Sequence, residues 1–253
     1  GKMTVKSKEE MEQILKELDG VSYEVSEVKN GERVKKAPLP FTTSTLQQEA
    51  SKTLNFSTQK TMSVAQQLYE GVDIKGSGTV ELISYLRTDS TRVSEEAAKA
   101  AHEYIASNYG ENYTSKGQSA KTSGKKIQDA HEAIRPTDLS RTPAAVKDSL
   151  TREQFRLYQL IWKRFAASQM ADAVYETSSV KIDGGKYRFT MSASRVTFDG
   201  FMAVYVQDEE KEGDSRLLKG FSKDTKLSLK EFESKQHFTQ PPAHYTEAAL
   251  VKT

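Results

Sequence analysis

The spacing of apolar residues changes along this chain, and that change most constrains what the chain can fold into. Between residues 41 and 170 the apolar side chains recur every three or four positions, which is typical of helices. From Val174 onward they alternate with polar residues, which predicts strands. The predicted strands are residues 174–182, 187–193, 201–206 and 227–238, with a turn at Asp183-Gly184-Gly185 between the first two.

The first 36 residues combine both patterns. A capping box at Ser7 begins an amphipathic helix, and a strand follows from Val21 with a turn at Asn30-Gly31. Two prolines at positions 38 and 40 then disfavour helix in the residues before them, which indicates a domain crossing. We therefore predict an α+β protein in which a mainly helical domain is inserted into a discontinuous antiparallel β domain. Its segments are residues 1–36, 37–171 and 172–253, and the last ends in a helix that stops after about two turns, as in a truncated chain.

Hydroxyl side chains divide the helical segment into separate helices. The predicted starts lie near Thr43 or Ser44, after Ser57, at Ser94, at Thr142-Pro143 and at Thr151. Trp162 is expected to pack in the core of the last helix rather than to stack on a ligand. Residues 71–78 are expected to form a surface insertion, and residues 108–128 a long mobile connection. Several helices around the strand-like residues 80–86 indicate a winged-helix-like unit.

Residues 83–92 concentrate reactive and phosphate-binding side chains. The run Ile-Ser-Tyr-Leu-Arg-Thr-Asp-Ser-Thr-Arg holds one tyrosine, two arginines, one aspartate and four hydroxyl residues. A tyrosine that attacks a phosphodiester needs an apolar anchor, a permanent cation and donors for the phosphate oxygens. Arg87 offers the cation, and donors are available at Ser84, Thr88, Ser90 and Thr91. The structural alternative is that Tyr85 sits in a half-buried strand followed by a turn.

Four blocks of the sequence, in this order, resemble the bacterial type IA DNA topoisomerases (DNA topoisomerase I). They are PFTTSTLQQEA at 40–50, AQQLYE at 65–70, YLRTDSTR at 85–92 and HEAIRP at 131–136. The resemblance covers essentially the whole chain and implies that Tyr85 cleaves one DNA strand and becomes joined to its 5′ phosphate. It implies a catalytic contact to phosphate from Arg87. DNA-binding or supporting roles fall on Ser84, Asp89, His131, Gln66, Glu70 and Arg135.

The resemblance also implies what lies around this segment in the full enzyme. The helical domain is expected to be winged-helix-like, and the β domain to form an arch from which the tyrosine-bearing domain lifts away. In that enzyme the cleaved strand allows strand passage and relaxation of negative supercoils. The bond energy stays in the tyrosyl phosphate, so ATP is not required, and no phosphate-binding GxxxxGK[ST] pattern occurs here.

The cofactor expected from the resemblance is Mg²⁺, bound by an N-terminal toprim domain that also supplies a catalytic glutamate. No segment here resembles that domain, so we expect no metal site in this fragment and little or no cleavage by it alone. The expected partners are single-stranded DNA and the toprim domain of the same polypeptide. Asp89 has a second possible role, which is to hold Arg87 in place, because a carboxylate is repelled by phosphate.

Composition limits the remaining choices. A net charge of +2 over 253 residues gives no general electrostatic grip on nucleic acid, and the absence of cysteine excludes disulfides and thiolate metal sites. No apolar run approaches the length of a membrane span, and the resemblance implies the bacterial cytoplasm, in association with the nucleoid.

Two other functions stay open at this point. One is a non-catalytic winged-helix DNA-binding module that uses Arg87, Arg92 and the lysine-rich loop near residue 121. The other is a metal-dependent hydrolase centred on His131, which would require further ligands that the sequence does not offer at ligand spacing. From the residue alone, His131 could also be a turn histidine whose ring is satisfied by backbone.

Overall fold

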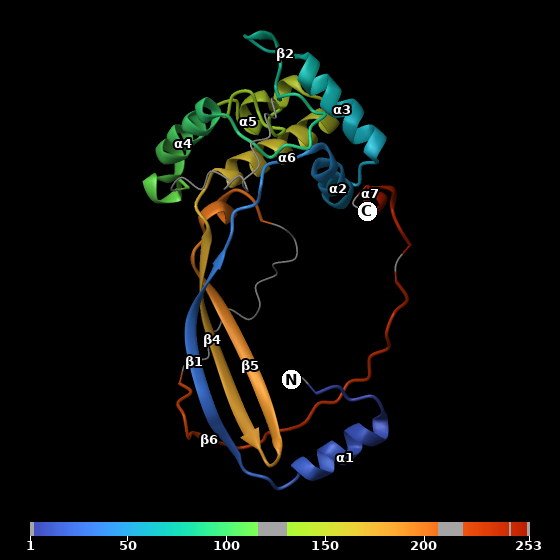
Figure 1. Cartoon of the computed structure of the whole chain (residues 1–253), viewed down its shortest axis with the longest axis vertical. Coiled ribbons are helices and arrows are strands. Elements are labelled where there is room, and N and C mark those ends of the chain that lie inside the picture. The colour runs from blue at the N-terminus through green and yellow to red at the C-terminus, as the bar shows by residue number, and fades with distance from the viewer. Residues whose placement is uncertain (1–2, 116–130, 207–219, 243, 252–253) are drawn as a thin grey trace. The chain divides into compact units, whose positions relative to one another are not determined.

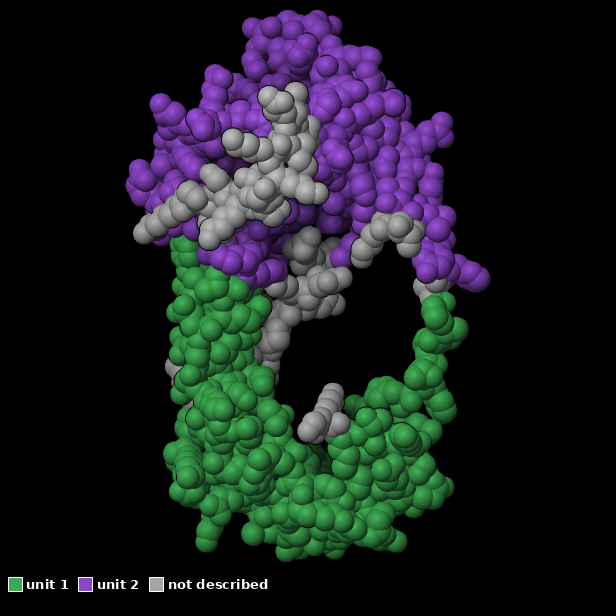
Figure 2. All heavy atoms as spheres, in the orientation of Figure 1, with its two compact units in different colours: residues 1–34, 174–198, 208–243 green, residues 35–173, 199–207, 244–253 purple. Residues whose placement is uncertain are grey.

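The computed structural model of the chain describes residues 3–115, 131–206, 220–242 and 244–251. They fall into two compact units, which Figure 2 colours separately. Unit 1 comprises residues 1–34, 174–198 and 208–243, and unit 2 comprises residues 35–173, 199–207 and 244–253. The boundaries expected from the sequence placed everything after residue 171 with the β domain. The units instead group the described parts of 199–207 and 244–253 with the helices.

In its described residues, unit 1 is a strand ribbon with the helix α1, Lys8–Leu18 (Figure 1). Its sheet has the strand order β5-β4-β1-β6, from β5 (Tyr187–Phe198), β4 (Ala173–Gly184), β1 (Tyr23–Lys35) and β6 (Lys226–Leu227). The β4–β5 hairpin is antiparallel, with Ser179 opposite Ser192, and β1 pairs antiparallel with β6. Alternating burial along β4 shows that one face of the ribbon is covered.

The helix α1 (Lys8–Leu18) closes the core of unit 1. The side chain of Ser7 accepts a hydrogen bond from the backbone of Glu10, which is the N-cap half of the predicted capping box, but the Glu10 carboxylate accepts from the amide of Lys6 instead of that of Ser7. Leu18 packs with four strand residues, which are Tyr23, Val25, Val180 and Ile182. The turn between β4 and β5 lies against this core so closely that a Cβ at Gly184 would lie 2.5 Å from the Tyr23 ring.

Two predicted strands are wrong. Residues 201–206 are not a strand; the 3₁₀-helix η3 (Gly200–Ala203) occupies their start. Phe201 and Tyr205 are both buried, and the Tyr205 amide donates to the Phe201 carbonyl at 3.1 Å, so this stretch follows a helical turn. Of the predicted strand at 227–238, only Leu227 pairs, in β6, and residues 228–242 have no regular structure.

Unit 2 contains the predicted helices. They are α2 (Thr43–Leu54), α3 (Thr58–Glu70), α4 (Glu95–Tyr109), α5 (Pro143–Val146), α6 (Arg152–Ser168) and α7 (Glu247–Leu250), with 3₁₀ turns η1 (Glu111–Tyr113) and η2 (Lys147–Ser149). Their N-caps are hydroxyl residues, namely Thr42, Ser57, Ser94, Thr142, Thr151 and Thr246. The core of unit 2 is built on α6, where Trp162 is only 5% exposed, which confirms its predicted packing role.

The connections in unit 2 differ from the expectation in detail. The insertion at 71–78 begins a two-stranded hairpin, β2 (Val72–Ile74) and β3 (Gly78–Val80). The strand-like residues 80–86 pair only at the end of β3 and at an isolated bridge between Ile83 and Pro136. The predicted connection at 108–128 begins inside α4 and continues through η1, and its part beyond residue 115 lies outside the described residues.

Three passages of the chain meet at one place in unit 2. Asp172 accepts a hydrogen bond from the backbone amide of Ala37 at 2.8 Å and pairs with Lys36 Nζ at 2.8 Å. The amide of Phe201 donates to the carbonyl of Ala171 at 2.9 Å. Gly200 lies against the same backbone with φ +50°, and a Cβ there would lie 2.5 Å from the carbonyl oxygen of Asp172. The chain therefore enters unit 2 at residues 36–37, leaves it at 171–172 and returns to it at 200–201 through contacts at one place.

Candidate active site

Tyr85 lies on an extended segment that is anchored on both sides. Thr43 donates its amide to the carbonyl of Thr88 at 2.9 Å on one side, and Ile83 bridges to Pro136 on the other. The apolar neighbours predicted as anchors are buried, with exposures of 0% for Leu82 and Ile83 and 1% for Leu86. The Tyr85 side chain is 45% exposed, so a fixed backbone presents an accessible phenol.

The hydroxyl groups near Tyr85 are used mainly by the protein itself. The Ser84 hydroxyl donates to the carbonyl of Ala133 and accepts from the amide of Arg135, both at 2.9 Å. Thr88 is buried, and its hydroxyl accepts from the amide of Ser90 at 3.1 Å. These contacts shape the backbone turn, as the structural alternative for this stretch predicts.

Two aromatic rings flank the Tyr85 ring. The ring of Tyr69 lies edge-on, with the two centroids 5.6 Å apart and an interplanar angle of 69°. The ring of His131 lies more nearly parallel, at 6.3 Å and 28°. His131 is exposed at the start of the HEAIRP block. The three neighbouring rings therefore come from three of the four blocks.

A hollow of about 430 Å³ lies beside this cluster. Its lining comes from three segments and consists of Thr42, Thr43, Ser44, Arg87, Thr88, Asp89 and His131. The N-terminal end of α2, where the backbone carries partial positive charge, contributes three of these residues. Arg87 adds a permanent positive charge, while Asp89 adds a negative one on the same wall. Arg87 and His131 thus line one hollow with Asp89, and Tyr85 is not among the lining residues.

Gln66 and Glu70 lie one helical turn apart at the end of α3. The Gln66 amide nitrogen donates to a carboxylate oxygen of Glu70 at 2.6 Å. Neither residue lines the hollow. Their helix is joined to the Tyr85 segment by a hydrogen bond from the amide of Leu82 to the carbonyl of Leu68 at 2.9 Å. Gln66 and Glu70 therefore lie on the helix that is hydrogen-bonded to the segment bearing Tyr85.

Arg135 is held by a neighbouring carboxylate. Its Nε lies 3.0 Å and its second terminal nitrogen 2.8 Å from Glu132 Oε2, and the first terminal nitrogen donates to the carbonyl of Pro136 at 3.1 Å. Burial opposes ionisation of Glu132, but hydrogen bonds from Ser94 and Arg135 and the charges of Arg135 and Arg92 outweigh it and lower the pKa of this carboxyl. Arg135 is not among the residues that line the hollow.

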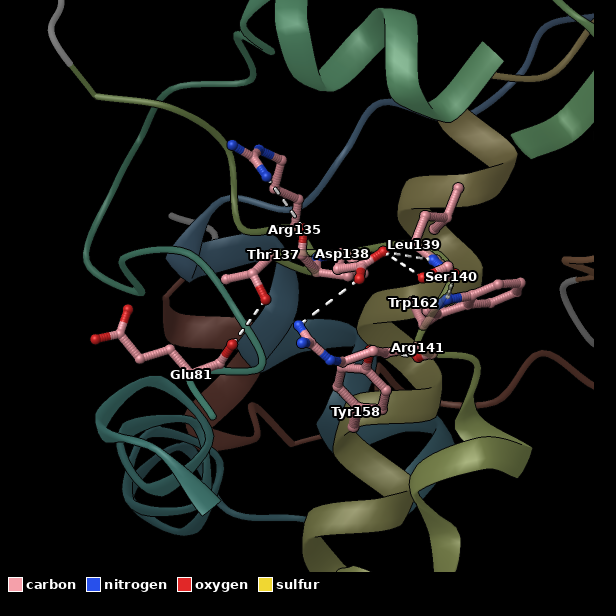
Figure 3. Close-up of polar contacts among 10 residues, drawn as sticks. Glu81, Arg135, Thr137, Asp138, Leu139, Ser140, Arg141, Tyr158 and Trp162 are labelled. Atoms are coloured by element: carbon pink, nitrogen blue, oxygen red, sulfur yellow. Dashed lines mark hydrogen bonds and ion pairs between the residues drawn. The ribbon is translucent and has the colours of Figure 1, made fainter. Parts of the chain in front are cut away.

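The segment after Arg135 is fastened to α6 and to the Tyr85 segment (Figure 3). The Thr137 hydroxyl donates to the carbonyl of Glu81 at 2.7 Å. From α6, the Tyr158 hydroxyl donates to the carbonyl of Arg141 at 2.7 Å, and burial raises the pKa of this phenol. The Trp162 ring nitrogen donates to the carbonyl of Leu139 at 2.9 Å. Two deeply packed side chains thus fix the loop that supports the site.

Sequence reasoning missed Tyr69. The signal that could have identified it is its place in the AQQLYE block, between Leu68 and the predicted site residue Glu70. Without the fold, nothing shows that the end of α3 reaches Tyr85, which lies sixteen positions further along the chain.

The described residues offer neither a metal cluster nor a bilayer span. Across residues 3–115, 131–206, 220–242 and 244–251, no three His, Asp or Glu side chains are grouped so that they could hold a metal ion. In the same residues, no helix combines the length and the apolar character needed to cross a membrane.

The chain is similar to known proteins over its whole length. The family model described as DNA topoisomerase matches residues 1–253. A crystal structure of full-length topoisomerase I from Thermotoga maritima matches with a TM-score of 0.78 and 36% sequence identity. That match covers 99% of this chain and 40% of the Thermotoga chain, so this chain spans less than half the length of that relative.

Proposed function

The chain belongs to the DNA topoisomerase family, and from that premise we propose that it is the cleavage and gate segment of a type IA enzyme. In this proposal the Tyr85 phenol oxygen attacks a phosphodiester of single-stranded DNA. One observation carries it: Tyr85 is 45% exposed on a rigidly anchored segment, beside a hollow lined by Arg87 and His131. A tyrosine with only a packing role would not require that combination.

The chemistry follows from these groups. The phenol loses its proton as its oxygen bonds to phosphorus, and the bond from phosphorus to the 3′ oxygen breaks, leaving the 5′ phosphate on Tyr85. The Arg87 fork pairs with phosphate oxygens and favours the phenolate. His131 contacts the phosphate next to the Tyr85 ring. Attack by the freed 3′ hydroxyl on the tyrosyl phosphate reverses the step, so no nucleotide is consumed.

Other residues in the proposal act by positioning Tyr85, Arg87 and His131. Ser84 fixes the backbone next to Tyr85, and Arg135 supports the HEAIRP segment through Glu132. Gln66 and Glu70 hold the end of α3 beneath the site. Asp89 lines the hollow together with Arg87, and in this proposal its carboxylate restrains Arg87 rather than contacting phosphate.

We also propose how the two units divide the work. Unit 2 is the winged-helix-like domain that bears the tyrosine, and unit 1 is the β arch into which it is inserted. This assignment is supported by the chain order, since unit 1 residues precede and follow the main part of unit 2. Moving the tyrosine-bearing unit away from the rest of the polypeptide would open a gate for a second strand, and the full enzyme would thereby relax negative supercoils.

The full enzyme must supply what this segment lacks. The leaving 3′ oxygen needs a proton donor, and we propose that a toprim domain earlier in the polypeptide provides it together with bound Mg²⁺. The isolated segment is then expected to bind single-stranded DNA without cleaving it. The proposed location is the bacterial cytoplasm, on nucleoid DNA.

The test is reconstitution of cleavage. The chain is mixed with a separately produced toprim portion, Mg²⁺ and end-labelled single-stranded DNA, and protein–DNA adducts are trapped with detergent. Tyr85→Phe should abolish the adduct, whereas Tyr245→Phe, at a tyrosine that is 74% exposed, should not. An adduct that persists in Tyr85→Phe contradicts the proposal. DNA binding without any adduct in the unmodified chain would favour the non-catalytic module.

A further inference from the structure

In the part of the chain that the structure describes, the ring of Tyr85 is flanked by two aromatic rings. It is 45% exposed, and the aromatic partners beside it are Tyr69 on α3 and His131 on the HEAIRP segment. A tyrosine ring turns about two side-chain torsions, so a firm backbone alone does not fix where its oxygen points. The orientation of the phenol therefore depends on the rings that flank it.

Tyr69 is the better fixed of the two flanking rings. It follows Leu68, which is 0% exposed and accepts the amide of Leu82 at 2.9 Å. The helix then ends at Gly71, with φ +118°, where a Cβ would lie 2.8 Å from the Thr79 side chain. The end of α3 and the start of the Tyr85 segment thus form one packed piece. His131, in contrast, is exposed.

We propose that Tyr69 is a positioning residue for the nucleophile, whose ring holds the Tyr85 ring in the orientation from which the phenol oxygen attacks phosphate. The inference rests on the proposed function of Tyr85 and adds a residue to it. The edge of one ring against the face of another is the arrangement that aromatic quadrupoles favour, and 5.6 Å between centroids lies within its range. Reaction rates respond steeply to such placement, because attack requires a near-aligned geometry.

The proposal makes the ring of Tyr69 essential and its hydroxyl dispensable. Tyr69→Phe keeps the edge-to-face contact, whereas Tyr69→Leu keeps apolar bulk but removes the ring. A matched control exists in the same unit: Tyr104 on α4 packs edge-on against Trp162, with centroids 5.9 Å apart and an angle of 86°. Tyr104→Leu removes a similar aromatic pair away from the hollow, so it reports the general cost of losing one.

The first measurement uses the 253-residue chain alone. The ring protons of Tyr85 are followed by NMR in protein with labelled tyrosine, and Tyr85→Phe identifies their signals. Tyr69→Leu should move these signals toward the shifts of a free tyrosine, while Tyr69→Phe and Tyr104→Leu should leave them in place. Unchanged Tyr85 signals in Tyr69→Leu would overturn the proposal, because its ring would then not be oriented by Tyr69.

The second measurement separates positioning from DNA binding. In the reconstituted cleavage assay at saturating DNA, Tyr69→Leu should slow adduct formation by about 10- to 100-fold, the cost of a misplaced reacting group. The DNA concentration at half-maximal rate should stay unchanged, and Tyr69→Phe should restore the rate. A rate for Tyr69→Leu equal to that of Tyr104→Leu, or a loss confined to DNA affinity, contradicts the proposal. If Tyr85→Phe still forms the adduct, the proposed function fails, while the NMR result still decides whether Tyr69 orients Tyr85.

Discussion

The hydroxyl of Ser84 donates a hydrogen bond to the carbonyl oxygen of Ala133 at 2.9 Å, although the two residues lie 49 positions apart. The same hydroxyl accepts the amide of Arg135. One side chain therefore joins the segment that bears Tyr85 to the segment that bears His131. Neither segment can shift along the other without leaving partly buried backbone groups unpaired, so the backbones that carry Tyr85 and His131 are held together.

Ser84→Ala should destabilise the chain by about 1–3 kcal/mol, because it leaves a backbone carbonyl and an amide without their partner. Urea denaturation measures the change. Ser77→Ala, in the exposed turn of the β2–β3 hairpin, is the control and should have a much smaller effect. If Ser84→Ala leaves stability intact but weakens DNA binding, then Ser84 is a phosphate donor as the sequence alone suggested.

Gly200→Ala should be more damaging than an alanine at another glycine with positive φ. The left-handed backbone costs about 1–2 kcal/mol at either position. At Gly200 the new Cβ also lies 2.5 Å from the carbonyl oxygens of Ala171 and Asp172, which adds overpacking of about 1–3 kcal/mol. Gly76, with φ +83° and nothing within 4 Å, is the control. Thermal unfolding compares the variants, and equal losses would mean that the Gly200 backbone relaxes freely.

Arg87→Ala should weaken binding of single-stranded DNA and reduce its salt dependence. Loss of one phosphate contact should lower the slope of log affinity against log salt by about 0.7. Fluorescence anisotropy with a labelled oligonucleotide over a salt series measures both quantities on the chain alone. Arg152→Ala, at the exposed start of α6, removes the same charge elsewhere and should leave the slope unchanged. Identical slopes for the two variants would remove Arg87 from the phosphate site.

Glu17 should make unit 1 sensitive to acid. Hydrogen bonds from Lys186, then Tyr187 and Gln13, lower the pKa of this carboxyl from 4.5 to about 2. A lowered pKa means that ionised Glu17 favours the folded state fully above pH 4.5, and that this contribution is lost as the pH falls to about 2. The stability difference between the unmodified chain and Glu17→Gln should therefore shrink over that window. Because the Glu17 side chain is 30% exposed to solvent, added salt should reduce the difference. A difference that is constant with pH would contradict the assignment.

Local signals made the helices of this chain predictable. A helix start depends on a hydroxyl and an amide three positions away, and Ser57, Ser94 and Thr151 all cap as expected. The failure at 201–206 has a distant cause. The alternation there resembles a strand, but the left-handed Gly200 and the hydrogen bond from Phe201 to Ala171 turn the chain instead. The sequence of residues 201–206 alone does not predict a hydrogen bond to Ala171, which lies thirty positions earlier.

The sequence indicated several residues that lie near one another in the candidate site, but not the contacts that support them. The blocks containing Arg87, Asp89 and His131 indicated side chains that the fold does place around one hollow. The sequence could not show that Glu132 would occupy the fork of Arg135, because that depends on how the HEAIRP segment turns. Tyr69 was missed for the same reason, since its significance comes from tertiary packing against Tyr85.

The contacts of Asp172 with Lys36 and Ala37 have a consequence for evolution and for protein engineering. A segment whose two ends lie in contact can be inserted into a loop of another protein without separating the ends of that loop. Unit 2 should therefore fold when it is inserted into another protein, provided that the segment with Phe201 and Tyr205 is included.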